Sequence, residues 1–554
     1  MRTDLRTRNV LITAAVLAAL AAGGAASAAA GDTEALLTLL TSKGVISSKE
    51  ARAITSAPAS EQGDRLVAIL RRKGVLGDGD LQALKSKRGP VSVASAPPGP
   101  VPVAAEPTDR APMARKAALA IGGFEITPVG RIALTSVTRP TNTGTGAATS
   151  FGTIPFDNTI QGNIGETRLT AQNTVLGLRA RGALMGMDLT GYFEGDFNGN
   201  NAANTFVNSN GHTFRMRLAY ADINSGRFET TFGQVYSWLT PNRFGMGPDP
   251  ADMFLTNNID QNFQVGLPWA RQAAVHVAWH AAPQFSVGVG VENPDQFTNG
   301  QVTFPYAFNA QLAPQFDANN NIGVPNRMPD VVAKAAFDGH LWSTTRLHLE
   351  AAGMWRHFEV TNLPQGNPSF VSHSAEGWVA TVAASLEFSK TFTLVGNGFW
   401  GNGGGRYLGA LGPDVVATLS GSPGAYDLGL SPVQSRGYLA GAEWRVLPTT
   451  VLSAYYGQVF FERNASLDAS SPQLIKPFVG FGGQNSSNSN NKQIEQWTAD
   501  VKHTFWADPY YGEVMGLAQY SYLRREPWFV ANGAPPEAHT HLFFTELRYQ
   551  LPGN

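Results

Sequence analysis

The chain has 554 residues, more than one ordinary domain needs, and its net charge of -1 argues against a nucleic-acid partner. It contains no cysteine, which excludes thiolate metal sites, iron–sulfur clusters and thiol nucleophiles. Glycine is abundant, with 59 residues, and only 15% of residues are charged. The mean hydropathy of -0.14 does not suit a bundle of membrane-spanning helices.

The first 28 residues have the three parts of a Sec signal peptide. Arg2, Arg6 and Arg8 form a basic start, Val10–Ala22 is an apolar run, and Ala26–Ala28 is a small-residue cleavage site. The alternative is an N-terminal membrane anchor, but a spanning helix needs about 20 apolar residues and this run is shorter. We therefore expect export through the Sec pathway and removal of residues 1–28.

Residues 31–88 contain an internal repeat, in which Glu34–Ile46 recurs as Asp64–Leu76. The apolar residues of both copies have helical spacing, and Ser47–Glu50 matches a capping box that would open a following helix. We predict a short helical segment whose apolar faces pair with each other or with neighbouring subunits. Residues 89–121 are rich in proline and alanine, which is typical of an extended linker.

From residue 122 to residue 554 the pattern changes to segments of alternating apolar and polar residues, separated by turn residues. In one such segment Arg215 and Arg217 are predicted to face a lumen, and the residues predicted to face lipid are Phe214, Met216, Leu218 and Tyr220. A second predicted lumen face consists of Thr190, Tyr192, Glu194 and Asp196. A third consists of Phe544, Glu546, Arg548 and Gln550.

The connections between these segments alternate between tight turns and long polar loops, and aromatic pairs such as Tyr455-Tyr456 and Phe460-Phe461 lie near segment ends. A soluble β-sandwich also alternates but explains neither feature. We predict an all-β transmembrane barrel of about sixteen antiparallel strands, preceded by a short periplasmic α-helical segment. The eight predicted long loops are 138–164, 199–212, 238–270, 295–329, 361–375, 402–435, 464–491 and 529–537.

Several short patterns together resemble the DcaP-like porins. The helical repeat and the proline-rich linker contribute, and the strand patterns that carry the resemblance are Glu166–Leu169, Gly191–Phe197, Arg217–Ala221 and Phe232–Ser237. The resemblance implies a homotrimeric sixteen-stranded porin with a periplasmic helical segment. It also implies passage of small anions such as dicarboxylates.

Arginine placement is the most informative chemistry of the barrel segment. Guanidinium groups on a pore wall attract anions and bind carboxylates, and the acidic residues nearby would create a transverse field. A net preference for anions and a weak or cation preference both remain open, because these arginines can also simply pair with the acids. The candidate pore-lining residues are Arg131, Arg168, Arg179, Arg181, Glu194, Asp196, Arg215, Arg217 and Arg271.

The third long loop, 238–270, is the predicted constriction if it folds inward, and a surface loop if it folds outward. Its candidate pore-lining residues are Trp238, Pro241, Asn242, Arg243, Asp249, Asp252 and Asp260.

Enzyme, cofactor and metal motifs are weak, so we expect no catalysis, no cofactor and no metal. The favoured function is passive diffusion of small hydrophilic or anionic solutes through the outer membrane of a Gram-negative bacterium. We expect outer-membrane lipid and the barrel-assembly machinery as partners. The alternatives are a lipid-hydrolysing barrel enzyme, which would need a Ser/His pair on a lipid-facing strand, and a non-conducting scaffold or adhesin barrel.

Overall fold

The computed structural model describes residues 41, 46–56, 65–66, 68–69, 72–73, 119–143, 148–199, 212–318 and 323–553. The chain divides into two compact units, Met1–Ala104 and Ala105–Asn554. The predicted signal peptide and most of the linker lie outside the described residues. Within the described part of the chain, no helix is long and apolar enough to cross a membrane.

The first unit contains helix α3 (Ser48–Thr55), which begins at the predicted capping box. The Ser47 side chain accepts a hydrogen bond from the Glu50 backbone N–H, and the Glu50 carboxylate accepts one from the Ser47 backbone N–H at 2.7 Å. Lys73 lies 2.7 Å from the same carboxylate and, with Ser47, lowers the pKa of Glu50 to about 2. The helix start is thus confirmed, whereas most residues of the two repeat copies lie outside the described residues.

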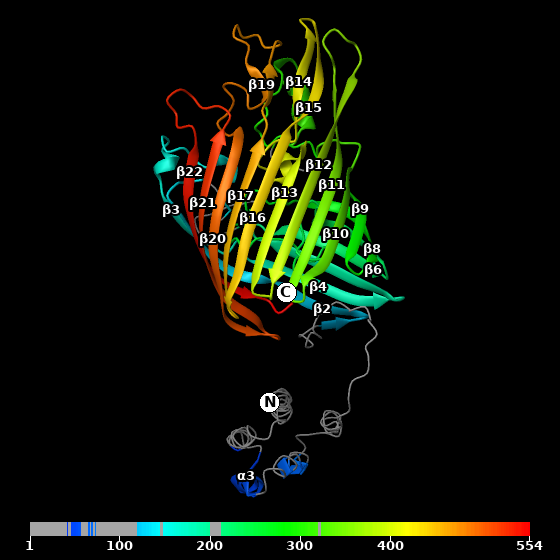
Figure 1. Ribbon diagram of the computed structural model, residues 1–554, viewed down its shortest axis with the longest axis vertical. Coiled ribbons are helices and arrows are strands. Elements are labelled where there is room, and N and C mark those ends of the chain that lie inside the picture. The colour runs from blue at the N-terminus through cyan, green and yellow to red at the C-terminus, as the bar shows by residue number, and fades with distance from the viewer. Residues whose placement is uncertain are drawn as a thin grey trace, which may run out of the picture. The chain divides into compact units, whose positions relative to one another are not determined.

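The second unit is a closed barrel of sixteen antiparallel strands (Figure 1). The strands are β2 (Phe124–Arg139), β4 (Val175–Leu184), β5 (Met187–Asp196), β6 (Arg215–Ser225), β7 (Phe228–Tyr236), β8 (Arg271–Ala282), β9 (Phe285–Glu292), β10 (Asp330–Trp342), β11 (Thr345–Asn362), β12 (Val371–Phe388), β13 (Phe392–Asn402), β16 (Gln434–Leu447), β17 (Thr450–Phe461), β20 (Asn491–Asp508), β21 (Gly512–Pro527) and β22 (Ala538–Gln550).

Further short elements extend these strands or lie in the loops. Strands β1 (Leu119–Ile121) and β3 (Glu166–Thr170) pair with β2, so the sheet begins just before the predicted boundary at residue 122. The loop hairpins are β14 (Val415–Ser422) with β15 (Ala425–Pro432) and β18 (Asn464–Leu467) with β19 (Phe478–Phe481). The loop helices are η1 (Phe151–Thr153), η2 (Gln161–Asn163), η3 (Tyr306–Phe308), α6 (Asn309–Leu312), η4 (Ala313–Gln315) and η5 (Gly405–Tyr407).

Strand β2 closes the barrel because it pairs with β4 on one side and with β22 on the other. Arg131 lies opposite both Val175 of β4 and Gln550 of β22 in the two ladders. Closure provides hydrogen-bond partners for the backbone groups that an open sheet would leave unpaired at its edges. It also places the first and last strands of the chain side by side.

Tight turns occupy one end of the barrel and long loops the other (Figure 1), as the sequence predicts. The third long loop, L3, runs from residue 237 to residue 270, between β7 and β8. The other long loops used below are L1 (140–165), L4 (293–329) and L6 (403–433). We call the two ends of the barrel the short-turn end and the long-loop end.

The predicted alternation of inward-facing and outward-facing side chains is confirmed where the strands are regular. Tyr192, Glu194 and Asp196 of β5 are buried, whereas Phe193 between them is 41% exposed on the outer face. On β22, Phe544 is buried and Phe543 is exposed in the same way. Inward and outward faces can therefore be assigned from burial.

Strand β6 departs from the predicted alternation because it contains a β-bulge. Glu194 of β5 pairs with Leu218, but the next residue, Gly195, pairs with Met216, so Arg217 is an extra residue in the ladder. A bulge shifts the side-chain parity of every residue that follows it. Leu218 and Tyr220 are consequently buried inside the barrel, and the prediction that they face lipid is wrong.

The aromatic girdle needs a similar correction, since adjacent residues on a strand face opposite sides. Tyr455 is buried inside the barrel, where its hydroxyl donates a hydrogen bond to Glu443, while Tyr456 packs against Trp497 on the outer face. Phe461 is also fully buried. Only one member of each of these two aromatic pairs therefore belongs to the outer surface.

Gly130 provides a test of barrel closure. It has a φ of +111°, and a Cβ atom added there would lie 2.1 Å from the Val175 carbonyl oxygen of β4. We expect Gly130→Ala to force β2 and β4 apart and to lower the urea concentration at which the folded barrel, followed by its gel mobility, unfolds. The control is Gly353→Ala, where the nearest atom to an added Cβ is 3.9 Å away and unfolding should be unchanged.

Candidate functional site

Loop L3 folds inward and lies against the inner wall of the barrel. Its apolar residues Ile259, Val265 and Leu267 are almost fully buried. Its backbone N–H groups donate hydrogen bonds to inward-facing side chains of distant strands. These bonds are Asn242 to Glu350 at 3.1 Å, Asn257 to Tyr455 at 3.2 Å, Ile259 to Gln519 at 2.6 Å and Val265 to Gln496 at 2.9 Å. Of the two arrangements that the sequence leaves open, the structure has the inward one.

One end of L3 is fixed by a buried lysine of β10. The Lys334 ammonium group lies 2.9 Å from the Glu350 carboxylate and donates hydrogen bonds to the Thr240 carbonyl oxygen and the Asn242 side-chain oxygen. The Lys334 side chain is fully buried and that of Glu350 is 3% exposed. A buried ammonium group needs such partners because its desolvation costs several kcal/mol.

The far part of L3 touches the wall through backbone atoms. A Cβ atom added to Gly457 of β17 would lie 1.7 Å from the Val265 carbonyl oxygen. Gly266 has a φ of +89°, and a Cβ atom there would lie 2.1 Å from the Tyr438 carbonyl oxygen. Two glycines thus allow the loop to approach β16 and β17 more closely than any side chain would permit.

A cavity of about 260 Å³ lies between L3 and the wall on the short-turn side of the loop. L3 contributes Pro250, Leu255 and Phe263 to its lining. Among its charged lining residues one is acidic, Glu194, and the five basic ones are Arg131, Arg179, Arg217, Lys502 and Arg548. The basic residues come from the first and the last strands of the barrel, because closure of the barrel places β20 and β22 near β2.

Three of these five cations are paired with acids. Arg179 lies 2.9 Å from Asp249 of L3, and Arg548 lies 2.6 Å from Glu546. Arg217 bridges Glu194 at 2.9 Å and Asp196 at 3.0 Å.

Arg131 and Lys502 have no carboxylate within ion-pair distance among the described residues. Arg131 donates only to the Asn173 carbonyl oxygen, at 3.1 Å. The Lys502 side chain has neither a hydrogen bond nor an ion pair within the described part of the chain. These two groups therefore leave the cavity with an excess of positive charge.

The remaining predicted arginines lie outside this cavity. Arg168 is paired with Glu166 at 2.7 Å and is half-exposed, and Arg215 is paired with Asp196 at 2.9 Å. Arg181 lies 3.8 Å from Asp249. Arg271 packs over the Trp269 ring at 5.5 Å, and its Nη1 has no hydrogen-bond partner among the described residues.

Most of the predicted constriction residues fix L3 to its surroundings. Trp238 stacks on His276 at 4.3 Å between ring centroids, and Arg243 donates to Glu443 at 2.9 Å. The Asp260 carboxylate accepts a hydrogen bond from the Thr149 backbone N–H at 3.2 Å. The Asp252 carbonyl oxygen accepts from the Arg243 N–H, which shapes the loop, and Asp249 pairs with wall arginines.

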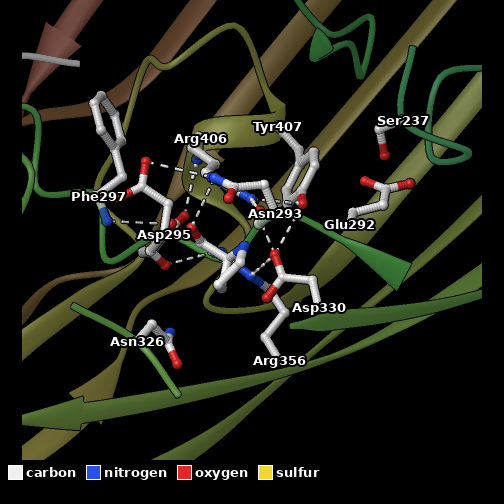
Figure 2. A network of polar contacts seen from close by, with 12 residues as sticks. Ser237, Glu292, Asn293, Asp295, Phe297, Asn326, Asp330, Arg356, Arg406 and Tyr407 are labelled. Carbon is white, nitrogen blue, oxygen red and sulfur yellow. Dashed lines mark hydrogen bonds and ion pairs between the residues drawn. The ribbon is translucent and has the colours of Figure 1, made fainter. Parts of the chain in front are cut away.

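A second polar network lies among the long loops (Figure 2). Arg356 of β11 lies 3.0 Å from Asp330 and 2.8 Å from Asp414, and Arg406 of L6 lies 3.0 Å from Asp330 and 3.3 Å from Asp295 of L4. Burial raises the pKa of Asp295 to about 6. The network joins L4 and L6 to the wall, and so holds both loops over the lumen.

The histidines give little support to catalysis. His503 on the outer face is hydrogen-bonded to Thr450, not to a serine. Inside the barrel, His280 contacts Ser286 at 2.8 Å and Glu229 at 2.9 Å, but Ser286 is an ordinary ladder residue of β9. No group of three or more potential metal ligands occurs among the described residues.

A closed sixteen-stranded barrel with an inward third loop is the architecture of porin-type β-barrels. The crystal structure of the outer-membrane channel DcaP of Acinetobacter baumannii is similar, with a TM-score of 0.53 at 14% identity over 78% of this chain and 99% of that chain. OprB of Pseudomonas putida matches at a TM-score of 0.41 and 12% identity, over 77% of this chain and 94% of that chain. No protein-family model and no curated protein matches the chain. At these identities the comparison with DcaP shows the fold.

The lysine anchor of L3 can be tested by removing one or both charges. We expect Lys334→Met to destabilise the barrel by about 1–3 kcal/mol, because the buried Glu350 carboxylate loses its ammonium partner while it keeps His348 at 3.1 Å and the Asn242 backbone N–H at 3.1 Å. The double variant Lys334→Met/Glu350→Met should recover most of this loss. Thermal unfolding followed by circular dichroism measures both, and equal loss in the single and double variants would contradict the pairing.

Proposed function

We propose that the protein is an outer-membrane channel through which small hydrophilic solutes diffuse passively, with a preference for anions. The excess positive charge of the cavity beside L3 carries this proposal. Arg131 and Lys502 face the cavity without a carboxylate partner among the described residues, so a solute carboxylate or phosphate can take that place. Binding in a channel must stay weak enough for the solute to be released.

The outer wall supports a membrane location. Large apolar side chains are exposed on strands all around the barrel, which in water would be an extensive apolar surface. Examples at least 40% exposed are Phe193, Trp279, Val289, Phe337, Leu349, Trp400 and Leu547. Aromatic rings also form contacts across neighbouring strands, such as Trp378 with Trp400 at 5.8 Å between centroids, as in the aromatic belts of membrane barrels.

The proposal extends to the biogenesis and assembly of the chain. The signal-peptide pattern supports Sec export. The even number of strands leaves both ends of the barrel segment at the short-turn end, which supports a periplasmic position for that end. Insertion would use the barrel-assembly machinery. The resemblance to DcaP-like porins supports a homotrimer, a periplasmic position for residues 31–88 and dicarboxylates among the solutes.

The decisive experiment is the reversal potential of the purified, refolded protein in a planar bilayer under a KCl gradient. We expect the sign of an anion-selective pore. A unit charge about 8 Å from an ion in water contributes about 0.5 kcal/mol, or a factor of about 2.4 in the occupancy of each ion type. Arg131→Gln and Lys502→Gln should therefore each lower the anion-to-cation permeability ratio about fivefold at low salt, and less at high salt, where charges are screened.

The matched control is Arg436→Gln on the outer face of β16, which should leave the ratio unchanged. A cation-selective wild type would contradict the anion preference. A folded barrel that passes no current would contradict the channel itself. It would favour the scaffold alternative, which has its own support in the apolar packing of L1, L3 and L6 residues such as Phe151, Ile259 and Leu408 inside the barrel.

A further inference from the structure

A second cavity, of about 170 Å³, lies on the long-loop side of L3. Its lining comes from L1, L3, L4 and L6, with Ser489 from the loop before β20. It is several times larger than the roughly 30 Å³ that one water molecule occupies in the liquid. The cavity can therefore hold a small solute and not only a single water.

The chemistry of this cavity differs from that of the cationic cavity. Among its described lining residues no side chain carries a charge. The polar lining consists mainly of amides and hydroxyls, and Val265, Leu408 and Leu411 give it an apolar side. A neutral solute that has both hydroxyl groups and a C–H surface matches this combination.

Gln301 is the most informative lining residue. It is only 6% exposed, and its Oε1 has no hydrogen-bond partner among the described residues. A buried amide oxygen without a partner costs about 1–3 kcal/mol, which a hydroxyl donor inside the cavity would recover. Gln301 lines the cavity wall, so a rotation of its terminal amide would turn this oxygen toward a solute in the cavity.

Two further amides are oriented so that their oxygens remain acceptors. Asn262 donates its Nδ2–H to the Thr149 carbonyl oxygen at 2.7 Å, and Asn299 donates to the Ala410 carbonyl oxygen at 2.9 Å. No donor among the described residues reaches either amide oxygen. Each of these amides also keeps a second N–H, so the cavity offers both acceptors and donors, which is the combination that a hydroxyl group matches.

The two cavities adjoin across one aromatic pair. Phe263 lines the cationic cavity and Trp269 lines the uncharged one, and the rings meet edge to face at 5.2 Å between centroids. A solute that moves from the long-loop end to the short-turn end would therefore meet the uncharged cavity before the cations.

We propose that the cavity around Gln301, Asn262 and Asn299 is a binding site for small neutral polyhydroxylated solutes, such as a single sugar ring or a short polyol. In a conducting channel it would favour solutes that carry hydroxyl groups over bare carboxylates. That consequence rests on the proposed channel function, whereas the binding itself does not.

The test is isothermal titration calorimetry of the folded, full-length protein in detergent with D-glucose as the probe. We expect weak saturable binding. Gln301→Met, which keeps the side-chain size but removes the acceptor, should weaken it about tenfold, the effect of losing one hydrogen bond. Leu411→Phe, which fills the cavity, provides an independent variant and should abolish binding.

The control variants separate this site from the rest of the barrel. Gln284→Met, in an exposed short turn, and Arg131→Gln/Lys502→Gln, in the cationic cavity, should both leave glucose affinity unchanged. Absence of glucose binding, or equal affinity in the Gln301→Met variant, would overturn the inference even if the pore is anion-selective. Glucose binding by a barrel that passes no current would support the site while removing the channel function.

Discussion

The pairing of β2 with β22 is the contact on which the rest of the barrel depends. It satisfies the backbone groups at the two ends of the sheet, and in doing so it brings the last strands beside the first. The cationic cavity exists only because of this closure, since Arg131 comes from the first strand while Lys502 and Arg548 come from β20 and β22. In an open sheet these charges would lie at opposite edges.

Inside the closed wall, the lumen is shaped by loops that satisfy their polar groups on the wall. L3 uses backbone N–H groups, a buried lysine and two glycine contacts, whereas L4 and L6 use the arginine–aspartate network around Asp330. The anchoring of L3 and the anchoring of L4 and L6 both place ionised groups in buried positions, where each group needs a partner of opposite charge or a hydrogen bond. The cationic cavity and the uncharged cavity beside L3 meet at the Phe263–Trp269 contact.

Much of this architecture was accessible from the sequence, because strand alternation and turn chemistry are local. The sixteen strands, the positions of the long loops and the helix cap at Ser47 follow from such patterns. The faces of Leu218 and Tyr220 did not, since a one-residue bulge depends on the pairing partner and not on the strand itself.

The cationic cavity was predictable only in part, because it also depends on contacts between strands that are distant in the sequence. The arginines of the early strands were identified from their alternation, and Arg548 was placed on a lumen face. The sequence offered no sign that Lys502 would join them, or that Lys334 would anchor L3, because both roles depend on contacts across the lumen. The uncharged cavity was missed entirely, as its amides come from separate loops.

The bulge at Arg217 has a consequence for how such a wall can change over evolutionary time. Inserting or deleting one residue in a strand exchanges the lipid face and the lumen face for everything downstream, without any substitution. In β6 this single extra residue converts Tyr220 from a membrane-facing position into part of the packing against L3. One insertion or deletion within a strand can therefore change several lumen-facing residues at once, whereas a point mutation changes one. Such a change requires that the outer wall tolerates the side chains that are turned toward it.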